Sequence, residues 1–239
     1  MKDMAERRLA KDKLNSSRVH LEEFVKRAAN SVAQSSRVLD AGAGSGLYSH
    51  LFDKMAYEAA DFCKVDETYV HLTYECNLES IPVEDERYDL VLLTQVLEHL
   101  PDPLAVLKEL HRVLRPGHRV WLSQPFYYEE HEQPYDFYRY TQFGLKYLLE
   151  GAGFKIEEIF WLEGYMGTLA YQFDLASRCL PIRPAHYGGR MAGVAAATLA
   201  ILLRPWLSAL SLLYARLDAR HRYTGAGHCK NYCVIAQKV

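Results

Sequence analysis

The sequence lacks the charge and cysteine patterns that mark several common protein classes. Its 28 basic and 30 acidic residues give a formal net charge of −2, so no broad basic field is available to attract nucleic acid phosphates. The five cysteines are odd in number and scattered, with no Cys-x-x-Cys pair, so they predict neither a disulfide framework nor a zinc site. We therefore expect reduced thiols and no nucleic acid partner.

The sequence also lacks a secretory leader and a long uninterrupted apolar run. Residues 1–18 are charged and contain no apolar core, which favours a cytoplasmic protein. The 13 apolar or small residues at 191–203 are followed by Arg204-Pro205, so we expect a helix too short to cross a bilayer. Two interpretations of residues 191–222 stay open. One is a packed helix pair, as a cap or a homodimer surface. The other is a hairpin that contacts the inner membrane surface, with headgroup contacts from Arg216, Arg220 and Arg222.

What the sequence does contain is an alternation of strand and helix patterns. Apolar runs typical of buried parallel strands alternate with segments of helical period between residues 37 and 163. This alternation predicts a doubly wound, Rossmann-like α/β fold with a seven-stranded mixed sheet, helices on both faces and a C-terminal apolar helical insertion. Residues 230–239 predict an edge strand that completes the sheet.

Helical period marks four segments of this core. They are residues 20–32, 46–56, 102–118 and 141–154. Thr141 is the expected N-cap of the last segment, and a Pro-Gly pair closes the third. The expected strands lie at residues 37–40, 57–62, 71–78, 87–97, 119–126 and 155–164.

The most informative stretch is "RVLDAGAGSGLYSHLF" at residues 37–52, where three glycines follow a buried strand at alternate positions. Backbone without Cβ atoms can approach a ligand closely. The spacing differs from the GxGxxG of dinucleotide sites, and no Gly-Lys-Ser/Thr follows as in a P-loop. Asp40, just ahead of the glycines, would repel a pyrophosphate but suits a ligand with an ammonium group. Asp61, about twenty residues further on, is placed to hold a ribose diol. A ligand with these three needs is S-adenosylmethionine.

The order of several motifs resembles the class I S-adenosylmethionine-dependent methyltransferases over residues 37–160. The motifs are "VLDAGAGSG", Asp61, "CNLESIP", "YDLVLLTQVLEHLPDP", "ELHRVLRPGHRVWLSQP" and "LLEGAGF". Within that class the "DFYRYT" segment is similar to a small-molecule and glycan-cluster branch. The resemblance implies methyl transfer with S-adenosylmethionine as the cofactor.

The resemblance also implies which residues bind the cofactor. The glycine turn would surround the methionine part and the ribose, and Asp61 would accept both ribose hydroxyls. Asn77 stands where the family usually has an aspartate that bonds the adenine amine, and an asparagine can still accept through its amide oxygen. Gln95 would lie under the methionyl chain. For Gly46 and Gln95, ordinary helix packing and a capped turn are the alternatives. The expected cofactor-binding residues are Asp40, Ala41, Gly42, Gly44, Gly46, Asp61, Asn77, Leu78 and Gln95.

The segment at residues 126–141 is the first candidate for the acceptor site. Methyl transfer needs alignment, and a hydroxyl acceptor also benefits from a base that removes its proton. The segment follows a predicted strand at the edge of the sheet where ligands bind, and carries His131 among carboxylates and seven aromatic residues. We predict His131 as the base and, as pocket walls, Tyr128, Tyr135 and Tyr138. A merely exposed His131 and a structural Asp136–Arg139 pair that holds the loop are the plainer alternatives.

The second candidate is "QVLEH", which contains Glu98 and His99. The resemblance implies that some family members bind a divalent metal here through a Glu-x-x-Glu-His pattern. Gln95 replaces the first carboxylate, so we expect no resident metal. A weak magnesium or zinc site is the alternative, and Glu98 and His99 can also cap the following turn.

The leading hypothesis is a cytoplasmic O-methyltransferase that acts on a small molecule or a sugar unit, lipid-linked glycan intermediates included. The alternative is a module that binds S-adenosylmethionine and serves as a scaffold in a biosynthetic complex. A nicotinamide-dependent oxidoreductase is disfavoured by the glycine spacing and by Asp40. The expected domains are an N-terminal helical cap at 1–36, a methyltransferase core at 37–165, an apolar hairpin or substrate cap at 166–222, and the last strand within 223–239.

Overall fold

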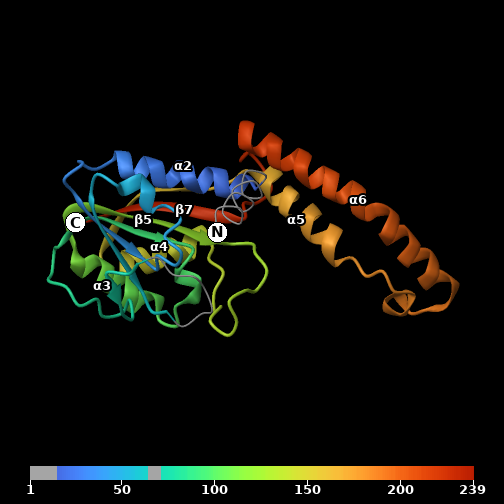
Figure 1. Cartoon of the computed structure of the whole chain (residues 1–239), viewed down its shortest axis with the longest axis horizontal. Coiled ribbons are helices and arrows are strands. Elements are labelled where there is room, and N and C mark those ends of the chain that lie inside the picture. Colours follow the sequence, from blue (N-terminus) through green and yellow to red (C-terminus); the bar gives the residue numbers. More distant parts are fainter. Residues whose placement is uncertain (1–14, 64–70) are drawn as a thin grey trace. The chain divides into compact units, whose positions relative to one another are not determined.

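The computed structural model describes residues 15–63 and 71–239 (Figure 1), and the chain forms two compact units. The larger unit comprises Leu21–Leu162 and Lys230–Val239, and the smaller comprises Glu163–Cys229 with the described residues up to His20. Residues 1–14 of the expected N-terminal cap lie outside the described ranges. The domain boundaries drawn from the sequence stay a prediction.

The larger unit contains a seven-stranded mixed sheet, as predicted. Its strand order is β3-β2-β1-β4-β5-β7-β6. Strands β1 to β5 pair in parallel, and β7 runs antiparallel to both of its neighbours. Their bounds are β1 (Arg37–Ala41), β2 (Ala56–Asp61), β3 (Tyr74–Glu75), β4 (Tyr88–Thr94), β5 (Leu114–Pro125), β6 (Phe154–Trp161) and β7 (Asn231–Lys238).

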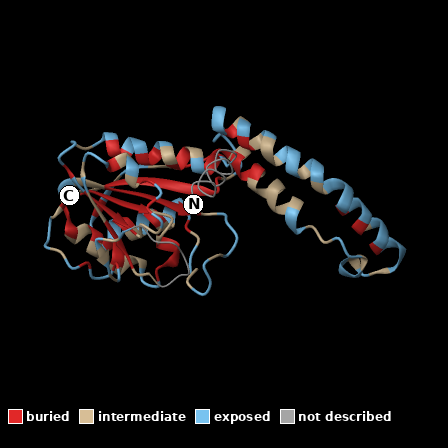
Figure 2. Cartoon of the chain, viewed as in Figure 1, coloured by how far each residue is buried: buried red, intermediate tan, exposed pale blue. Residues whose placement is uncertain are grey.

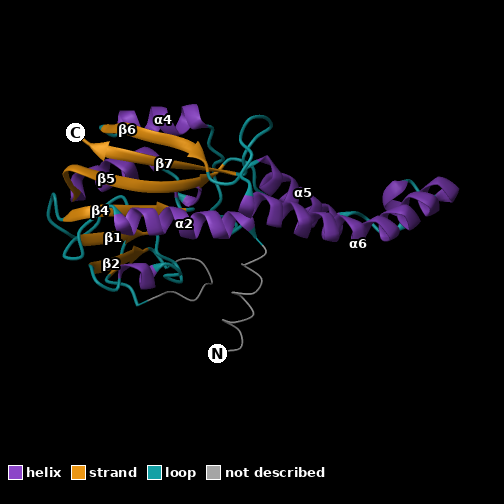
Figure 3. Ribbon diagram, turned by 90° about the horizontal axis from the view of Figure 1, so that it is seen from above, coloured by secondary structure: helices purple, strands orange, loops and turns teal. Residues whose placement is uncertain are grey.

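Helices cover both faces of this sheet. Figures 1 and 3 show α2 (Ser16–Asn30) over one face, with α3 (Pro103–Val113) and α4 (Gln142–Gly151) over the other. The apolar stripe of α2 packs on β5, where the ring centroids of Phe24 and Trp121 lie 5.1 Å apart. Thr141 caps α4 as predicted, since its hydroxyl accepts from the amide of Gly144 at 3.1 Å.

The centre of the sheet determines where a ligand can bind. Strands β1 and β4 are adjacent and almost entirely buried, as parallel strands covered on both faces should be (Figure 2). The chain leaves β1 for β2 on one side and leaves β4 for β5 on the other. Strand order therefore reverses between β1 and β4, and ligands of open α/β sheets bind outside the carboxyl ends of the strands at such a point.

Three expectations for the core are wrong in detail. The helix expected at 46–56 is one 3₁₀ turn, η1 (Ser49–Phe52), because only nine residues separate Gly46 from the start of β2. The third strand shrinks to Tyr74–Glu75. The last strand is not at an edge: β7 lies between β5 and β6, which agrees with its continuous burial.

The smaller unit is a helical hairpin of α5 (Tyr165–Cys179) and α6 (Arg190–Arg220), joined through η3 (Pro184–Tyr187). The helices touch through the rings of Phe173 and Tyr214, and the hydroxyl of Ser211 donates to the carbonyl oxygen of Ala170 at 2.8 Å. Asp218 is fully buried on α6, where it accepts from the amide of Gly164 at 2.9 Å and lies 3.3 Å from His20.

The expected interruption at Arg204-Pro205 is wrong, because α6 runs through Pro205 as a single helix of 31 residues. Proline removes one amide donor from a helix. Here α5 packs beside the half of α6 that begins at Arg204, and the connection at 180–189 packs beside the half before it. The argument that this segment is too short to cross a bilayer is therefore also wrong. By length and composition alone, α6 is long and apolar enough to cross a membrane.

Candidate functional site

The glycine turn lies at the carboxyl end of β1 and is held by β2. The amides of Gly42 and Ala43 both donate to the carbonyl oxygen of Ala60, at 2.8 and 3.2 Å. Gly42 has a φ of +76°, a conformation that residues with a Cβ rarely adopt. A Cβ at Gly42 would also lie 2.6 Å from a methyl carbon of Val96, behind β4. Glycine at position 42 is thus required both by the positive φ and by the close approach of Val96.

Asp61 belongs to the same turn although it lies on the next strand. Its Oδ2 accepts from the amide of Gly44 at 2.9 Å, and its Oδ1 accepts from the amide of Phe62 at 2.7 Å. The buried carboxylate therefore fixes the glycine turn and stands beside it, where a ribose diol would meet it. Its contact with ribose stays a prediction.

Asp40 is a buried carboxyl at the end of β1. Burial raises its pKa to about 6, and the nearby charge of Asp61 acts in the same direction. A hydrogen bond from the hydroxyl of Tyr57, 2.6 Å from Oδ2, opposes this rise. A cationic group of a ligand placed beside Asp40 would favour its ionised form.

Cofactor affinity should depend on pH through Asp40. We expect S-adenosylhomocysteine to bind with constant affinity above pH 7 and about tenfold more weakly per pH unit once Asp40 is protonated, below about pH 6. Protonation removes the negative charge that attracts the ligand's ammonium group. Calorimetric titrations between pH 5 and 8 measure this.

Two variants separate Asp40 from other titrating groups. Asp40→Asn should abolish the pH dependence. Tyr57→Phe should move the midpoint to higher pH, because it removes the hydrogen bond that holds the pKa of Asp40 down. An unchanged midpoint in Tyr57→Phe would contradict the assignment.

The remaining cofactor candidates are either buried or hydrogen-bonded to other groups of the protein. Ala41 and Leu78 are buried. The amide oxygen of Asn77, expected at the adenine, accepts from the backbone amide of Glu79 at 3.1 Å. Gln95 has a φ of +57°, and its side-chain amide donates to the hydroxyl of Ser123 at 3.1 Å. Both side chains have partners inside the protein, and their cofactor roles stay predictions.

The candidate acceptor segment at residues 126–141, called the acceptor loop below, contains the predicted Asp136–Arg139 pair. Arg139 donates through Nη1 and Nη2 to the two oxygens of Asp136, at 2.6 and 2.7 Å. Burial raises the pKa of Asp136, but hydrogen bonds from Arg139 and from the amide of His131 outweigh it and bring the pKa to about 2. Asp136 is therefore an ionised carboxylate at neutral pH.

His131 is oriented by that carboxylate. Its Nδ1 lies 3.3 Å from Oδ2 of Asp136 and 3.2 Å from the carbonyl oxygen of Glu129. Two acceptors beside Nδ1 favour the tautomer that carries the proton there. This arrangement leaves Nε2 as the nitrogen able to accept a proton. The side chain is partly buried, and its role as a base stays a prediction.

Glu98 and His99 lie on η2 (Leu97–His99), the short 3₁₀ turn that follows β4 in the sequence. Nδ1 of His99 is 2.6 Å from the carbonyl oxygen of Tyr135, which can only accept, so this nitrogen carries a proton. Glu98 is fully buried, and its carboxyl oxygens accept no hydrogen bond from the described part of the chain. Burial raises the pKa of Glu98 to about 8, so it is largely protonated at neutral pH.

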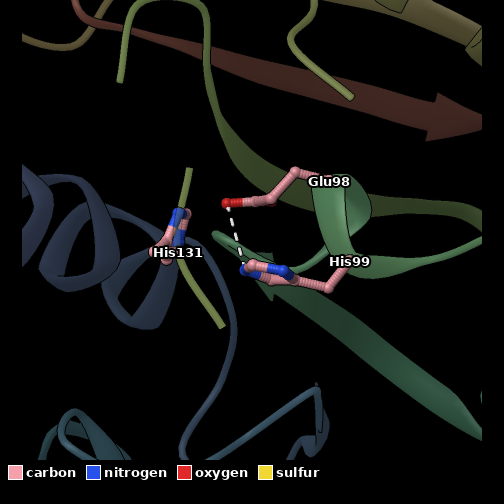
Figure 4. A group of neighbouring side chains, drawn as sticks. All are labelled: Glu98, His99 and His131. Atoms are coloured by element: carbon pink, nitrogen blue, oxygen red, sulfur yellow. Dashed lines mark ion pairs between the residues drawn. The ribbon is translucent and has the colours of Figure 1, made fainter. Parts of the chain in front are cut away.

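Three of the four predicted catalytic residues converge. Figure 4 shows His131 facing Glu98 and His99, and one donor atom from each lies within 4.8 Å of the others. The fourth, Tyr128, packs edge-on against His131 with ring centroids 5.1 Å apart. Such a cluster can take a proton from an acceptor or, with two imidazoles and a carboxylate, hold a divalent cation.

Tyr135 links the cluster to the residues beside the glycine turn at 42–46, the expected cofactor turn. Tyr135 of the acceptor loop packs edge-on against Phe62, the residue after Asp61, with ring centroids 5.9 Å apart. The amides of Phe137 and Tyr138 donate to the carbonyl oxygen of Glu98, which pins the loop on η2. Tyr138, expected in the pocket wall, donates its hydroxyl to the carbonyl oxygen of Pro101.

Four residues of the site have no counterpart in the sequence analysis. They meet their partners across strands or loops, which no local pattern records: Tyr57 at Asp40, Phe62 at Tyr135, Val96 at Gly42, and Lys230, whose ammonium lies 5.3 Å from the ring of Tyr128. Of these four, only Val96 could have been suspected from the sequence, because it follows the predicted site residue Gln95 at the end of a strand.

Known families match this chain over its core. A family profile described as a methyltransferase domain matches residues 14–159, more than half of the chain. One curated relative is the ubiquinone biosynthesis O-methyltransferase of Vibrio cholerae serotype O1, with 32% identity over 106 residues. That match covers 36% of this chain and 41% of the relative, so less than half of the relative's length is represented.

Solved structures share the fold. One is a possible histamine N-methyltransferase of Thermotoga maritima, with a TM-score of 0.56 and 14% identity over 99% of this chain and 96% of that one. Another is the 1,6-didemethyltoxoflavin-N1-methyltransferase of Burkholderia thailandensis, which holds S-adenosylhomocysteine. Its TM-score is 0.53, with 17% identity over 92% and 78% of the two chains. At such identities the likeness concerns the fold alone.

Proposed function

Because the chain belongs to the class I S-adenosylmethionine-dependent methyltransferases, we propose that it methylates a hydroxyl group of a small molecule or a sugar unit. The observation that carries this proposal is the cluster of Glu98, His99 and His131 beside the cofactor turn. A hydroxyl must lose a proton as its oxygen is methylated, and the cluster offers imidazole nitrogens for that proton.

The roles follow from the contacts. The bound cofactor supplies an electrophilic methyl group. Nε2 of His131 takes the proton of the acceptor hydroxyl as the oxygen–carbon bond forms, and Asp136 keeps Nδ1 of His131 protonated and directed away. Glu98, neutral near pH 7, lies 3.7 Å from Nε2 of His99, just beyond hydrogen-bond distance. Tyr128 and Tyr135 bound the space in front of the imidazoles.

Two further observations support a hydroxyl acceptor. The curated relatives from Vibrio cholerae and Aliivibrio fischeri are both O-methyltransferases by name. The acceptor loop also contains seven aromatic residues, a composition suited to the faces of phenols or sugar rings. The glycan-cluster branch, suggested by the "DFYRYT" segment, and a lipid-linked acceptor, suggested by the apolar, arginine-flanked segment 191–222, belong to this proposal.

An acceptor screen tests the proposal. We expect formation of S-adenosylhomocysteine with phenols or with sugars that carry free hydroxyls, and none with amines of matched size. Because the base acts on the acceptor and not on the cofactor, turnover should rise with pH while cofactor affinity above pH 7 stays constant. Turnover confined to amines would contradict the proposal.

A metal-assisted version is a second candidate, favoured by the buried carboxyl of Glu98 facing two imidazoles. Chelation followed by stepwise return of Mg²⁺ or Zn²⁺ separates the two versions. Activity that survives chelation supports the metal-free base. Binding of S-adenosylhomocysteine without turnover on any acceptor would instead support the scaffold alternative.

A further inference from the structure

Helix α6 is exposed over most of its length (Figure 2), and its outer face is apolar. Its large exposed side chains include Met191, Leu199, Leu202, Trp206, Leu210 and Leu213. Trp206 is 71% exposed, and only 11% of the most apolar window of the helix is buried. Monomeric soluble proteins rarely expose apolar surface on this scale without a partner for it.

The one charge within this run points elsewhere. Arg204 donates through Nη2 to the carbonyl oxygens of Arg178 and Leu180, at 2.9 and 2.6 Å, where α5 ends. The next charges along α6 are Arg190 at its start and Arg216 toward its end. The exposed face is therefore uncharged for 25 residues, from 191 to 215, and has arginine at both ends.

The α5–α6 hairpin has an excess of positive charge. Residues 163–229 contain seven arginines and three acidic residues, a formal charge of +4 (seven minus three), in a chain whose net charge is −2. Glu163 and Asp218 are fully buried, and Asp174 pairs with Arg178. A positively charged rim around an apolar face is complementary to a membrane surface with anionic headgroups.

The segment that connects α5 to α6 argues against a bilayer-crossing orientation of α6. The segment 180–189, which contains only the short turn η3, runs beside the first half of α6: Leu180 lies at Arg204, and the carbonyl oxygen of Pro184 lies 2.5 Å from where a Cβ of Gly193 would be. If α6 crossed a bilayer, this segment and Arg183 would enter the hydrocarbon, where backbone groups need internal partners. A helix that lies in the interface leaves them in water.

We propose that the α5–α6 hairpin docks on an anionic membrane surface, with the outer face of α6 in the headgroup and acyl boundary. Trp206 is at the middle of this face, and tryptophan is favoured at membrane interfaces. The arginines at both ends of the face contact lipid phosphates. The inference rests on the smaller unit alone and is independent of the acceptor.

Vesicle binding by the intact protein tests the inference. We expect co-sedimentation with vesicles of phosphatidylcholine and phosphatidylglycerol, at least tenfold above that with phosphatidylcholine alone, and its loss in high salt. Arg216→Ala should weaken binding about fivefold, the usual contribution of one basic residue at such a surface. Leu202→Asp should abolish it, since it places an acid on the apolar face.

A matched control comes from the other unit. Tyr147 on α4 is 78% exposed, so Tyr147→Asp also replaces an exposed apolar side chain by an acid, and it should leave vesicle binding unchanged. Helix content by circular dichroism and titration with S-adenosylhomocysteine show that each variant is folded, and they also separate failure of this inference from failure of the proposed function.

Three results would overturn the inference. Equal pelleting with neutral vesicles that resists alkaline carbonate would mean that α6 spans the bilayer. No pelleting, together with a doubled mass in analytical ultracentrifugation that Leu202→Asp restores to one chain, would mean a homodimer surface. Wild-type binding by Leu202→Asp would mean that another part of the chain meets the lipid.

Discussion

Gly42→Ala should lower the affinity for S-adenosylhomocysteine at least a hundredfold and leave the protein folded at room temperature. The φ of +76° at Gly42 strains any residue with a Cβ, and the new methyl group would overlap the side chain of Val96. To relieve this overlap the glycine turn must move. Its backbone amides, which donate to the carbonyl oxygen of Ala60 and the carboxylate of Asp61, would move with it. Isothermal titration of the variant measures the loss, and thermal unfolding measures the cost to stability.

The chain offers a control that separates strain from overlap. Gly117 has nearly the same φ, +79°, but a Cβ there would meet nothing within 4 Å. Gly117→Ala should therefore cost stability without changing cofactor affinity. Combining Gly42→Ala with Val96→Ala removes the two closest contacts, those to the methyl groups of Val96, and leaves the strain, so it should recover part of the lost affinity. Wild-type affinity in Gly42→Ala alone would show that the turn does not contact the cofactor.

His131→Gln should lower kcat on a hydroxyl acceptor by about 10² to 10⁴, the usual contribution of a general base. Glutamine fills a similar space but cannot take the proton that Nε2 accepts. Cofactor affinity should not change, because His131 lies on the acceptor loop and the cofactor turn is held by other residues. The rate of the variant should also rise with hydroxide concentration, because solvent then removes the proton.

Matched substitutions distinguish chemistry from loop structure. His118 also lies near a carboxylate, 3.5 Å from Asp89, but outside the site, so His118→Gln should keep full activity. Asp136→Asn keeps the shape of the loop and removes the charge beside Nδ1. It should lower kcat less than His131→Gln, because the imidazole remains but loses the carboxylate that orients its Nδ1. Normal turnover by His131→Gln would move the role of base to His99.

Much of the core could be predicted because its signals are local. The glycine turn, the N-cap at Thr141, the pairing of Asp136 with Arg139 and the apolar stripe of α2 each depend on residues close together in sequence. Spacing and periodicity carry such information directly. The order of these motifs then indicated the family and the cofactor.

What could not be predicted depends on residues that meet only in three dimensions. No periodicity places Tyr57 on Asp40 or Val96 against Gly42, because strand register decides both contacts. The prediction of a break at Pro205 was wrong because packing of α5 and of the connection at 180–189 against the two halves of α6 overrode the local rule for proline. The position of β7 inside the sheet likewise depends on long-range pairing.

The place of β7 has a consequence for the order in which the larger unit is assembled. Gln237 donates its side-chain amide to the carbonyl oxygen of Gly117, which lies 120 positions earlier in the chain. Until β7 is synthesised, β5 and β6 have no strand between them, and each exposes backbone groups that readily pair with other chains. The whole segment 163–229 leaves the ribosome during that interval. Sheet closure is therefore a late, high-contact-order step, and such steps are slow and prone to aggregation.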